Sequence, residues 1–278
     1  MQVIIGKSIK ALPNLRHLTI HTGFAKYCAF DLDTLIELES ISISGTPRTG
    51  TDLFHKLARL YASSPRLTSV ELFPSRISKI SNLHFVFGKC NKRSPPHRLR
   101  HLGLHSCFFR LDKVTLPHLR YLKSLDLELS YIDTFREPRV AGVASSPDEI
   151  WRTFLGSGIH LEELKHDLIP MSLIDYLSSY SGLKKLRLMV ESDNRNCLAA
   201  ANPFFNKCLT NHVDTLEELI LIARHEGPWT FCSDNSKSIA KCTRLKLLAM
   251  NVSLDLGKET SSTQWELPDD NVVVSHPP

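Results

Sequence analysis

Apolar residues return along the chain in a triplet with the spacing L-x-x-L-x-L, which occurs nine times. The first residues of successive triplets lie 22 to 39 residues apart. Within a triplet, apolar and other side chains alternate, as in Leu102-Gly103-Leu104, which predicts a short strand with one buried face. The triplets begin at Leu15, Leu38, Leu67, Leu99, Leu122, Leu161, Leu183, Leu216 and Leu245.

Helical patterns fill the stretches between the triplets. Residues 51–61 carry an apolar stripe at helical spacing, and Ser146-Pro147-Asp148-Glu149 forms a capping box that opens a second helix. Further helices are expected to start at Ser172 and at Asn202-Pro203, with a weaker one over 233–241. Strands that alternate with helices indicate an α/β fold with a parallel sheet.

The period and the triplet together are typical of a leucine-rich-repeat solenoid. We therefore expect a curved parallel sheet of about nine strands backed by helices, since each triplet supplies one strand. The solenoid is expected to cover residues 1–256, and residues 257–278 form a polar C-terminal tail. A solenoid presents a long binding surface, which favours an interaction protein.

Two places depart from the repeat. The stretch from Leu122 to Leu161 is the longest, and its excess, residues 131–145, reads as an exposed loop. The sixth triplet ends in His166 where an apolar residue belongs. Either that strand bulges, with Leu168 taking the buried place, or the sheet is interrupted there.

Composition and charge narrow the function classes. The net charge is +5, and the basic residues are dispersed apart from short groups such as Lys89, Lys92, Arg93, Arg98 and Arg100, which argues against nucleic-acid binding. The N-terminus lacks the apolar core of a signal peptide, and no window approaches a membrane span. The seven cysteines include no C-x-x-C pair, which argues against a structural zinc site. We expect a cytoplasmic or nuclear protein with reduced thiols and no membrane contact.

No arrangement typical of an enzyme is visible, so we expect a chain without catalytic activity, cofactor or metal. Four histidines, His17, His21, His101 and His105, occupy outward-facing strand positions, and we expect scattered surface side chains there. Cys107 fits the turn position of the repeat, and Cys197, Cys208 and Cys242 are expected to pack on helix faces.

The outward-facing strand positions point to a binding site in repeats five to eight. Charge of both signs adjoins an apolar edge there, a mixture that supplies orientation and affinity at protein interfaces. The alternatives are an ordinary solvated surface and, for the apolar end, burial beneath the C-terminal tail. The expected partner-binding residues are Asp126, Glu128, Lys165, Lys185, Arg187 and Ile220.

The triplets of residues 12–20, 97–104, 122–127, 183–188 and 215–221 resemble the repeats of F-box leucine-rich-repeat proteins, especially the divergent fungal versions. This resemblance implies the substrate-recognition part of a ubiquitin-ligase adaptor. The first repeat begins near Leu12, so we expect no F-box within this chain. Contact with a ubiquitin-ligase scaffold is then expected only if an F-box is missing from this chain, and no functional residue is carried over.

A regulator of an enzyme is the alternative function. Repeat proteins of the GTPase-activating type need a catalytic arginine on a loop between repeats. Arg136 and Arg139 on the long loop are the candidates here.

Overall fold

The computed structural model describes residues 12, 14–21, 32, 34–45, 50–73, 86–88, 98–105, 110–129, 145–190 and 195–252. The chain divides into two compact units, Met1–Leu161 and Glu162–Pro278. We refer to them as the N-terminal unit and the C-terminal unit. Within the described residues, no helix is long and apolar enough to cross a membrane.

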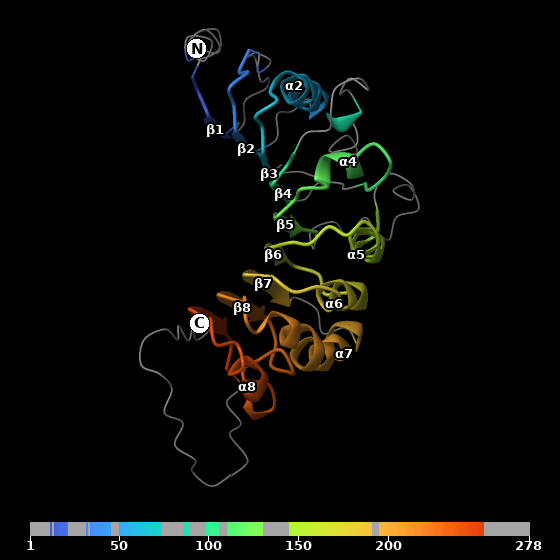
Figure 1. Cartoon of the computed structure of the whole chain (residues 1–278), viewed down its shortest axis with the longest axis vertical. Helices are drawn as coiled ribbons and strands as arrows, with labels where there is room; N and C mark the ends of the chain where they lie inside the picture. The colour runs from blue at the N-terminus through green and yellow to red at the C-terminus, as the bar shows by residue number, and fades with distance from the viewer. Residues whose placement is uncertain are drawn as a thin grey trace. The chain divides into compact units, whose positions relative to one another are not determined.

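The N-terminal unit contains five parallel strands in sequence order, with helices on one side of them (Figure 1). Its strands are β1 (His17–His21), β2 (Ser40–Ser44), β3 (Ser69–Phe73), β4 (His101–His105) and β5 (Ser124–Glu128). Its helices are α2 (Gly50–Ser63), α4 (Leu116–Leu119) and α5 (Pro147–Gly156).

The C-terminal unit repeats this plan with four parallel strands in sequence order. The strands are β6 (Glu163–His166), β7 (Lys185–Val190), β8 (Glu218–Ala223) and β9 (Leu247–Met250). The helical segments are α6 (Met171–Leu177), α7 (Arg195–Pro203), the π-helix η3 (Phe204–Cys208), the 3₁₀-helix η4 (Leu209–His212) and α8 (Ser233–Ile239). Within the described residues the chain thus has one strand per triplet, nine in all, and the predicted α/β solenoid architecture is confirmed.

The triplet residues form ladders across neighbouring strands. In the N-terminal unit, Ile41, Val70, Leu102 and Leu125 lie opposite one another on β2 to β5, and all four are buried. Equivalent residues therefore stack on each other from repeat to repeat, which is how a solenoid builds a continuous core from units too small to have one alone. The residues between them on each strand face away from this core.

The helix expected from the capping box is confirmed. The Ser146 hydroxyl accepts a hydrogen bond from the Glu149 amide, the Glu149 carboxylate accepts one from the Ser146 amide, and Pro147 is the first helical residue. Gly158, two residues beyond the end of the helix, has a positive φ of 62°. The chain leaves the helix there in the left-handed region that glycine adopts at little cost.

His166 corrects the expectation for the sixth triplet. β6 pairs with β7 in continuous register, with His166 opposite Leu188, so the strand does not bulge. The imidazole takes the buried position itself at 1% exposure, and Leu168 is only partly buried. The Asp167 carboxylate, also buried, lies 3.5 Å from its Nδ1 and gives the ring a polar neighbour.

The helix expected to start at Asn202-Pro203 starts earlier, so this prediction is wrong. Helical structure begins at Arg195, and Pro203 is inside the helical segment. A proline in a helix removes one backbone hydrogen bond, and the wider π turns of Phe204–Cys208 follow it directly. Phe204 and Phe205 are thereby placed against the Trp229 ring, at centroid distances of 5.2 and 6.0 Å.

Several expectations fall outside the described residues. They are residues 131–144 of the expected loop, with Arg136 and Arg139, the turn residue Cys107, and the tail over residues 257–278 together with its boundary at 256. Ser145, the last residue of that loop, is described and is buried instead of exposed, and its hydroxyl accepts a hydrogen bond from the Leu111 amide.

Candidate functional site

The outward-facing residues of the C-terminal unit form two parallel rows across β6 to β9. The first row lies nearer the strand starts and contains Glu163, Lys185, Glu218 and Leu247. The second row, two residues further along each strand, contains Lys165, Arg187, Ile220 and Ala249. Because the strands are parallel and in register, each residue of a row faces its neighbour directly.

The first row is internally ion-paired. Lys185 Nζ lies 3.4 Å from the Glu163 carboxylate on one side and 3.6 Å from the Glu218 carboxylate on the other. The attraction of Glu163, followed by its hydrogen bond and the charge of Glu218, raises the pKa of Lys185. Two carboxylates thus share one ammonium, so the only cation of the first row already has its partners.

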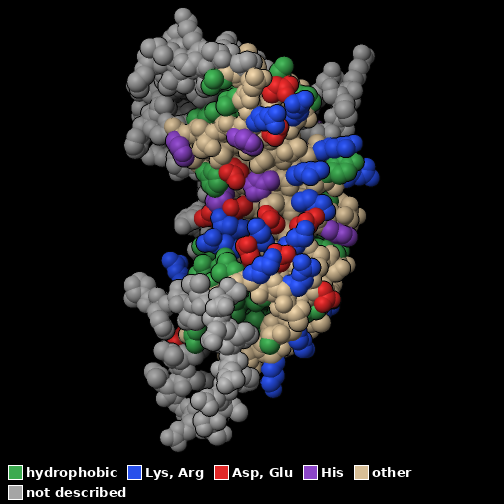
Figure 2. Space-filling view, turned by 60° about the vertical axis from the view of Figure 1, so that its left-hand side comes forward, with side chains coloured by type: hydrophobic (Ala, Val, Ile, Leu, Met, Phe, Trp, Pro, Cys, Tyr) green, Lys and Arg blue, Asp and Glu red, His purple; other side chains and the backbone are tan. Residues whose placement is uncertain are grey.

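The second row contains Arg187, which differs from Lys185 in its lack of an ion pair with any described residue. The Arg187 side chain is exposed. Ile220 on β8 lies directly opposite Arg187. Two residues further along β8, Ile222 lies opposite Met189, and its side chain is 41% exposed. In Figure 2, blue and red side chains interleave in the middle of the strand face and green ones adjoin them. A guanidinium without an ion pair among the described residues thus borders exposed apolar surface.

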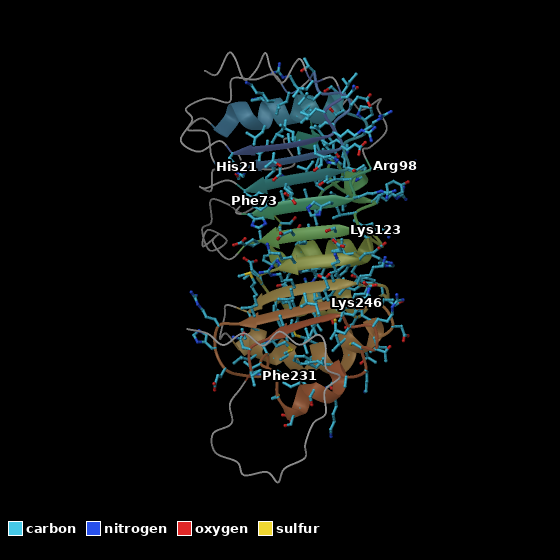
Figure 3. All side chains as sticks on the ribbon, turned by 90° about the vertical axis from the view of Figure 1, so that its left-hand side faces the viewer. His21, Phe73, Arg98, Lys123, Phe231 and Lys246 are labelled. Carbon is cyan, nitrogen blue, oxygen red and sulfur yellow. The ribbon has the colours of Figure 1, made fainter. Side chains whose placement is uncertain are left out.

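Charges just before the strands contrast with Arg187, because they are paired. Lys184 and Lys246 each place Nζ 2.8 Å from a carboxylate, of Glu162 and Glu217 respectively. The hydrogen bond from Lys246 and its charge lower the pKa of Glu217. Lys246 is at the strand-start edge in Figure 3. Exposed pairs of this kind add little stability, but they satisfy their own charges.

In the N-terminal unit, Asp126 and Glu128 on β5 are both engaged by one histidine. His105 Nε2 lies 3.2 Å from the Asp126 carboxylate, and its Nδ1 lies 2.5 Å from the Glu128 carboxylate. The Phe73 ring covers the imidazole at a centroid distance of 4.1 Å. The two acids therefore hold a histidine in place instead of facing solvent alone.

His101 belongs to the same surface. Its Nε2 lies 3.0 Å from the Glu71 carboxylate, and its Nδ1 lies 2.9 Å from the Ser124 hydroxyl. Gly103 on β4 lies between two acidic residues, because it faces Glu71 on β3 and Asp126 on β5. The expectation of scattered surface histidines is wrong here, because the strand register fixes a carboxylate beside each of these two rings.

The candidate binding residues thus belong to two groups. Strands β6 to β8 bring Lys165, Lys185, Arg187 and Ile220 together in the C-terminal unit. Asp126 and Glu128 belong to the N-terminal unit. A binding role for all six stays a prediction. Sequence reasoning missed the histidine partner of Asp126 and Glu128, although aligning the triplets of β4 and β5 would have set His105 directly opposite Glu128.

Two further features of the described residues concern metal ligands and cysteine thiols. No group of three histidine, cysteine or acidic side chains there is arranged to hold a metal ion. Cys197, Cys208 and Cys242 are buried, as packing residues are. Burial raises the pKa of Cys208 to about 12 and that of Cys242 to about 11, which suppresses the thiolate that a nucleophile needs.

Neither the models of known protein families nor the curated proteins include a match to this chain.

Proposed function

We infer that this protein is a non-catalytic interaction module, and that the second row of the C-terminal unit contacts its protein partner. The observation that carries this proposal is Arg187, an exposed arginine without an ion pair among the described residues, next to Ile220 and near the exposed Ile222. A partner with an acidic group beside an apolar side chain would complement both features.

Physical chemistry favours this row over its neighbour. Arginine is enriched at protein interfaces, and its planar fork binds a carboxylate with two hydrogen bonds. The adjoining apolar surface supplies affinity through burial, while the charge sets orientation. Lys185 offers less, because binding a new carboxylate there would compete with Glu163 and Glu218.

The finer form of the proposal is the substrate-recognition part of a ubiquitin-ligase adaptor in the cytoplasm or nucleus. It rests on the resemblance of the triplets to F-box leucine-rich-repeat proteins. In that role the second row would select the protein to be modified, and a scaffold would be bound through another chain or segment.

Affinity purification of the tagged chain, followed by mass spectrometry, tests the proposal. The variant is Arg187→Glu with Ile222→Asp, which reverses the charge and removes the apolar neighbour. Lys185 is left intact because its reversal would bring three carboxylates together. The matched control is Lys207→Glu with Leu198→Asp, on exposed helical positions of the same unit.

We expect partner proteins to be retained by the intact chain and by the control, and to be lost from the Arg187→Glu, Ile222→Asp variant. Equal retention by all three would show that the row does not bind them. Recovery of ubiquitin-ligase scaffold subunits, bridged by another chain, would support the finer form. Retained partners whose ubiquitylation is the same with and without this chain would count against it.

A further inference from the structure

A second surface, made of other residues than the two rows, has the composition of an anion site. In the N-terminal unit, an open hollow of about 590 Å³ is bordered by Arg98, Lys113 and Arg120. Arg98 lies just before β4, Lys113 just before α4, and Arg120 just after it. In Figure 3, Arg98 and Lys123 lie at the edge where the strands start and project away from the sheet.

None of the three cations of this hollow is neutralised by a residue that the structure describes. Each is exposed, and none forms an ion pair with a described residue. No acidic side chain is among the described residues that line the hollow. Three positive charges around one opening repel one another, which favours an anion between them.

The acidic residue next to Lys113 in the sequence, Asp112, binds other partners. Its carboxylate accepts hydrogen bonds from the amides of Val114 and Thr115, at 2.9 and 3.1 Å. It also pairs with Arg110 at 3.3 Å. Asp112 therefore fixes the turn that carries Lys113 instead of neutralising the lysine.

Tyr121 holds one of the cations in place. The Arg98 guanidinium carbon lies 5.1 Å from the centroid of the Tyr121 ring, a cation–π contact. Stacking uses the flat face of the guanidinium and leaves its N–H edge available for oxygen atoms. Tyr121 itself is 48% exposed, so ring and guanidinium border the hollow together.

We propose that this hollow binds a phosphorylated side chain of a partner polypeptide. A phosphate monoester carries nearly two negative charges and three acceptor oxygens, which suits several converging cations better than a single carboxylate does. Leu116, Pro117 and Ile159 also line the hollow and offer apolar contact to residues beside the phosphate. The proposal is independent of the second row and of its partner.

A nucleic acid fits the same surface less well. Single strands bind along extended basic grooves that carry several aromatic platforms. Here the cations gather around one hollow, and the aromatic residue among its described lining is already stacked on Arg98. The arrangement suits one phosphate, not a row of them.

The test uses the intact chain and two pools of short fluorescent peptides with randomised flanks. One pool has a central phosphoserine and the other a central serine, and binding is followed by fluorescence anisotropy. We expect the phosphoserine pool to bind about tenfold more tightly or better, since charged hydrogen bonds are gained. Inorganic phosphate should displace it.

The variant Arg98→Ala with Arg120→Ala should weaken binding of the phosphoserine pool by about tenfold or more. Lys207→Ala with Lys241→Ala is the control, because it removes the same charge from exposed positions of the C-terminal unit. Circular dichroism checks folding, and Lys113→Ala serves as the second variant if the double variant unfolds.

Equal binding of the two pools would overturn the proposal. So would undiminished binding by the folded double variant or, if that variant unfolds, by Lys113→Ala. A single-stranded oligonucleotide that binds these cations more tightly than the phosphoserine pool would also overturn it, in favour of a nucleic-acid site.

Discussion

The Nε2–H group of His212 donates a hydrogen bond to the Leu177 carbonyl oxygen, 2.9 Å away. The Nδ1 atom of the same ring accepts one from the Leu183 amide at 3.3 Å. The ring is 1% exposed. Only the neutral imidazole can satisfy both partners, because the protonated ring has no acceptor.

The C-terminal unit should therefore lose stability in mild acid. Burial lowers the pKa of His212 in the folded chain, against a smaller opposing effect of the Leu177 hydrogen bond. Below the unfolded pKa of about 6.5 the unfolded chain takes up a proton that the folded chain refuses, so stability falls as pH falls. Urea unfolding measures the free energy of unfolding at about pH 7 and about pH 5. Its decrease between these pH values should be smaller for His212→Gln than for the intact chain. An equal loss in both proteins would contradict this role.

Gly103 is expected to tolerate a side chain poorly. A Cβ atom there would lie 3.0 Å from Cγ of Glu71, and moving Glu71 would break its contact with His101. Gly103→Ala should cost about 1 kcal/mol or more of unfolding free energy, as overpacking does. In a Glu71→Ala background this cost should largely disappear. Strict additivity in the double-mutant cycle would show that the two positions are not coupled.

The strand register can be checked by three substitutions. Leu102 is fully buried, so Leu102→Ala should destabilise by about 2–5 kcal/mol. The sequence alone predicts a near-neutral His101→Ala, but the loss of bonds to Glu71 and Ser124 raises its expected cost to about 1 kcal/mol. Ser69→Ala on the outward face should stay within about 0.5 kcal/mol. A cost at Ser69 equal to that at Leu102 in chemical denaturation would mean that the register is shifted by one residue.

The buried thiols should resist alkylation in the folded protein. Cys208 is buried, and burial raises its pKa to about 12, so it has little thiolate to react with iodoacetamide. Cys232 is partly exposed and should be labelled first among the four cysteines that the structure describes. Peptide mass spectrometry before and after unfolding reads out the order. Labelling of Cys208 as fast as Cys232 would contradict its burial.

The repeat made the fold predictable from the sequence. Each triplet places two alternating apolar residues on one face, so the spacing alone assigns Leu102 and Leu125 to the core, where both lie. The capping box at Ser146 was predictable for the same reason, because it involves residues only three positions apart. His166 and Pro203 could not be predicted in this way. At position 166 the apolar spacing does not tell that an imidazole takes the buried place, and at position 203 the helix continues through the proline into a π turn.

The candidate sites were less predictable, because they depend on contacts between residues far apart in the chain. The triplet shows that Lys185 and Arg187 face outward, but not that Glu163 and Glu218 pair with the lysine and leave the arginine exposed. The hollow bordered by Arg98 joins residues from before β4, around α4 and after α5. No local sequence pattern predicts that these residues lie together.

Isothermal titration calorimetry tests the central claim most directly, once a partner has been recovered with the intact chain. The quantity is the dissociation constant of the purified partner for the intact chain, Arg187→Ala and the control Lys207→Ala. We predict that Arg187→Ala weakens binding by about tenfold or more, as loss of a charged hydrogen bond at an interface does, and that the control binds normally. An unchanged dissociation constant for Arg187→Ala would contradict the assignment of the second row as the partner-binding surface.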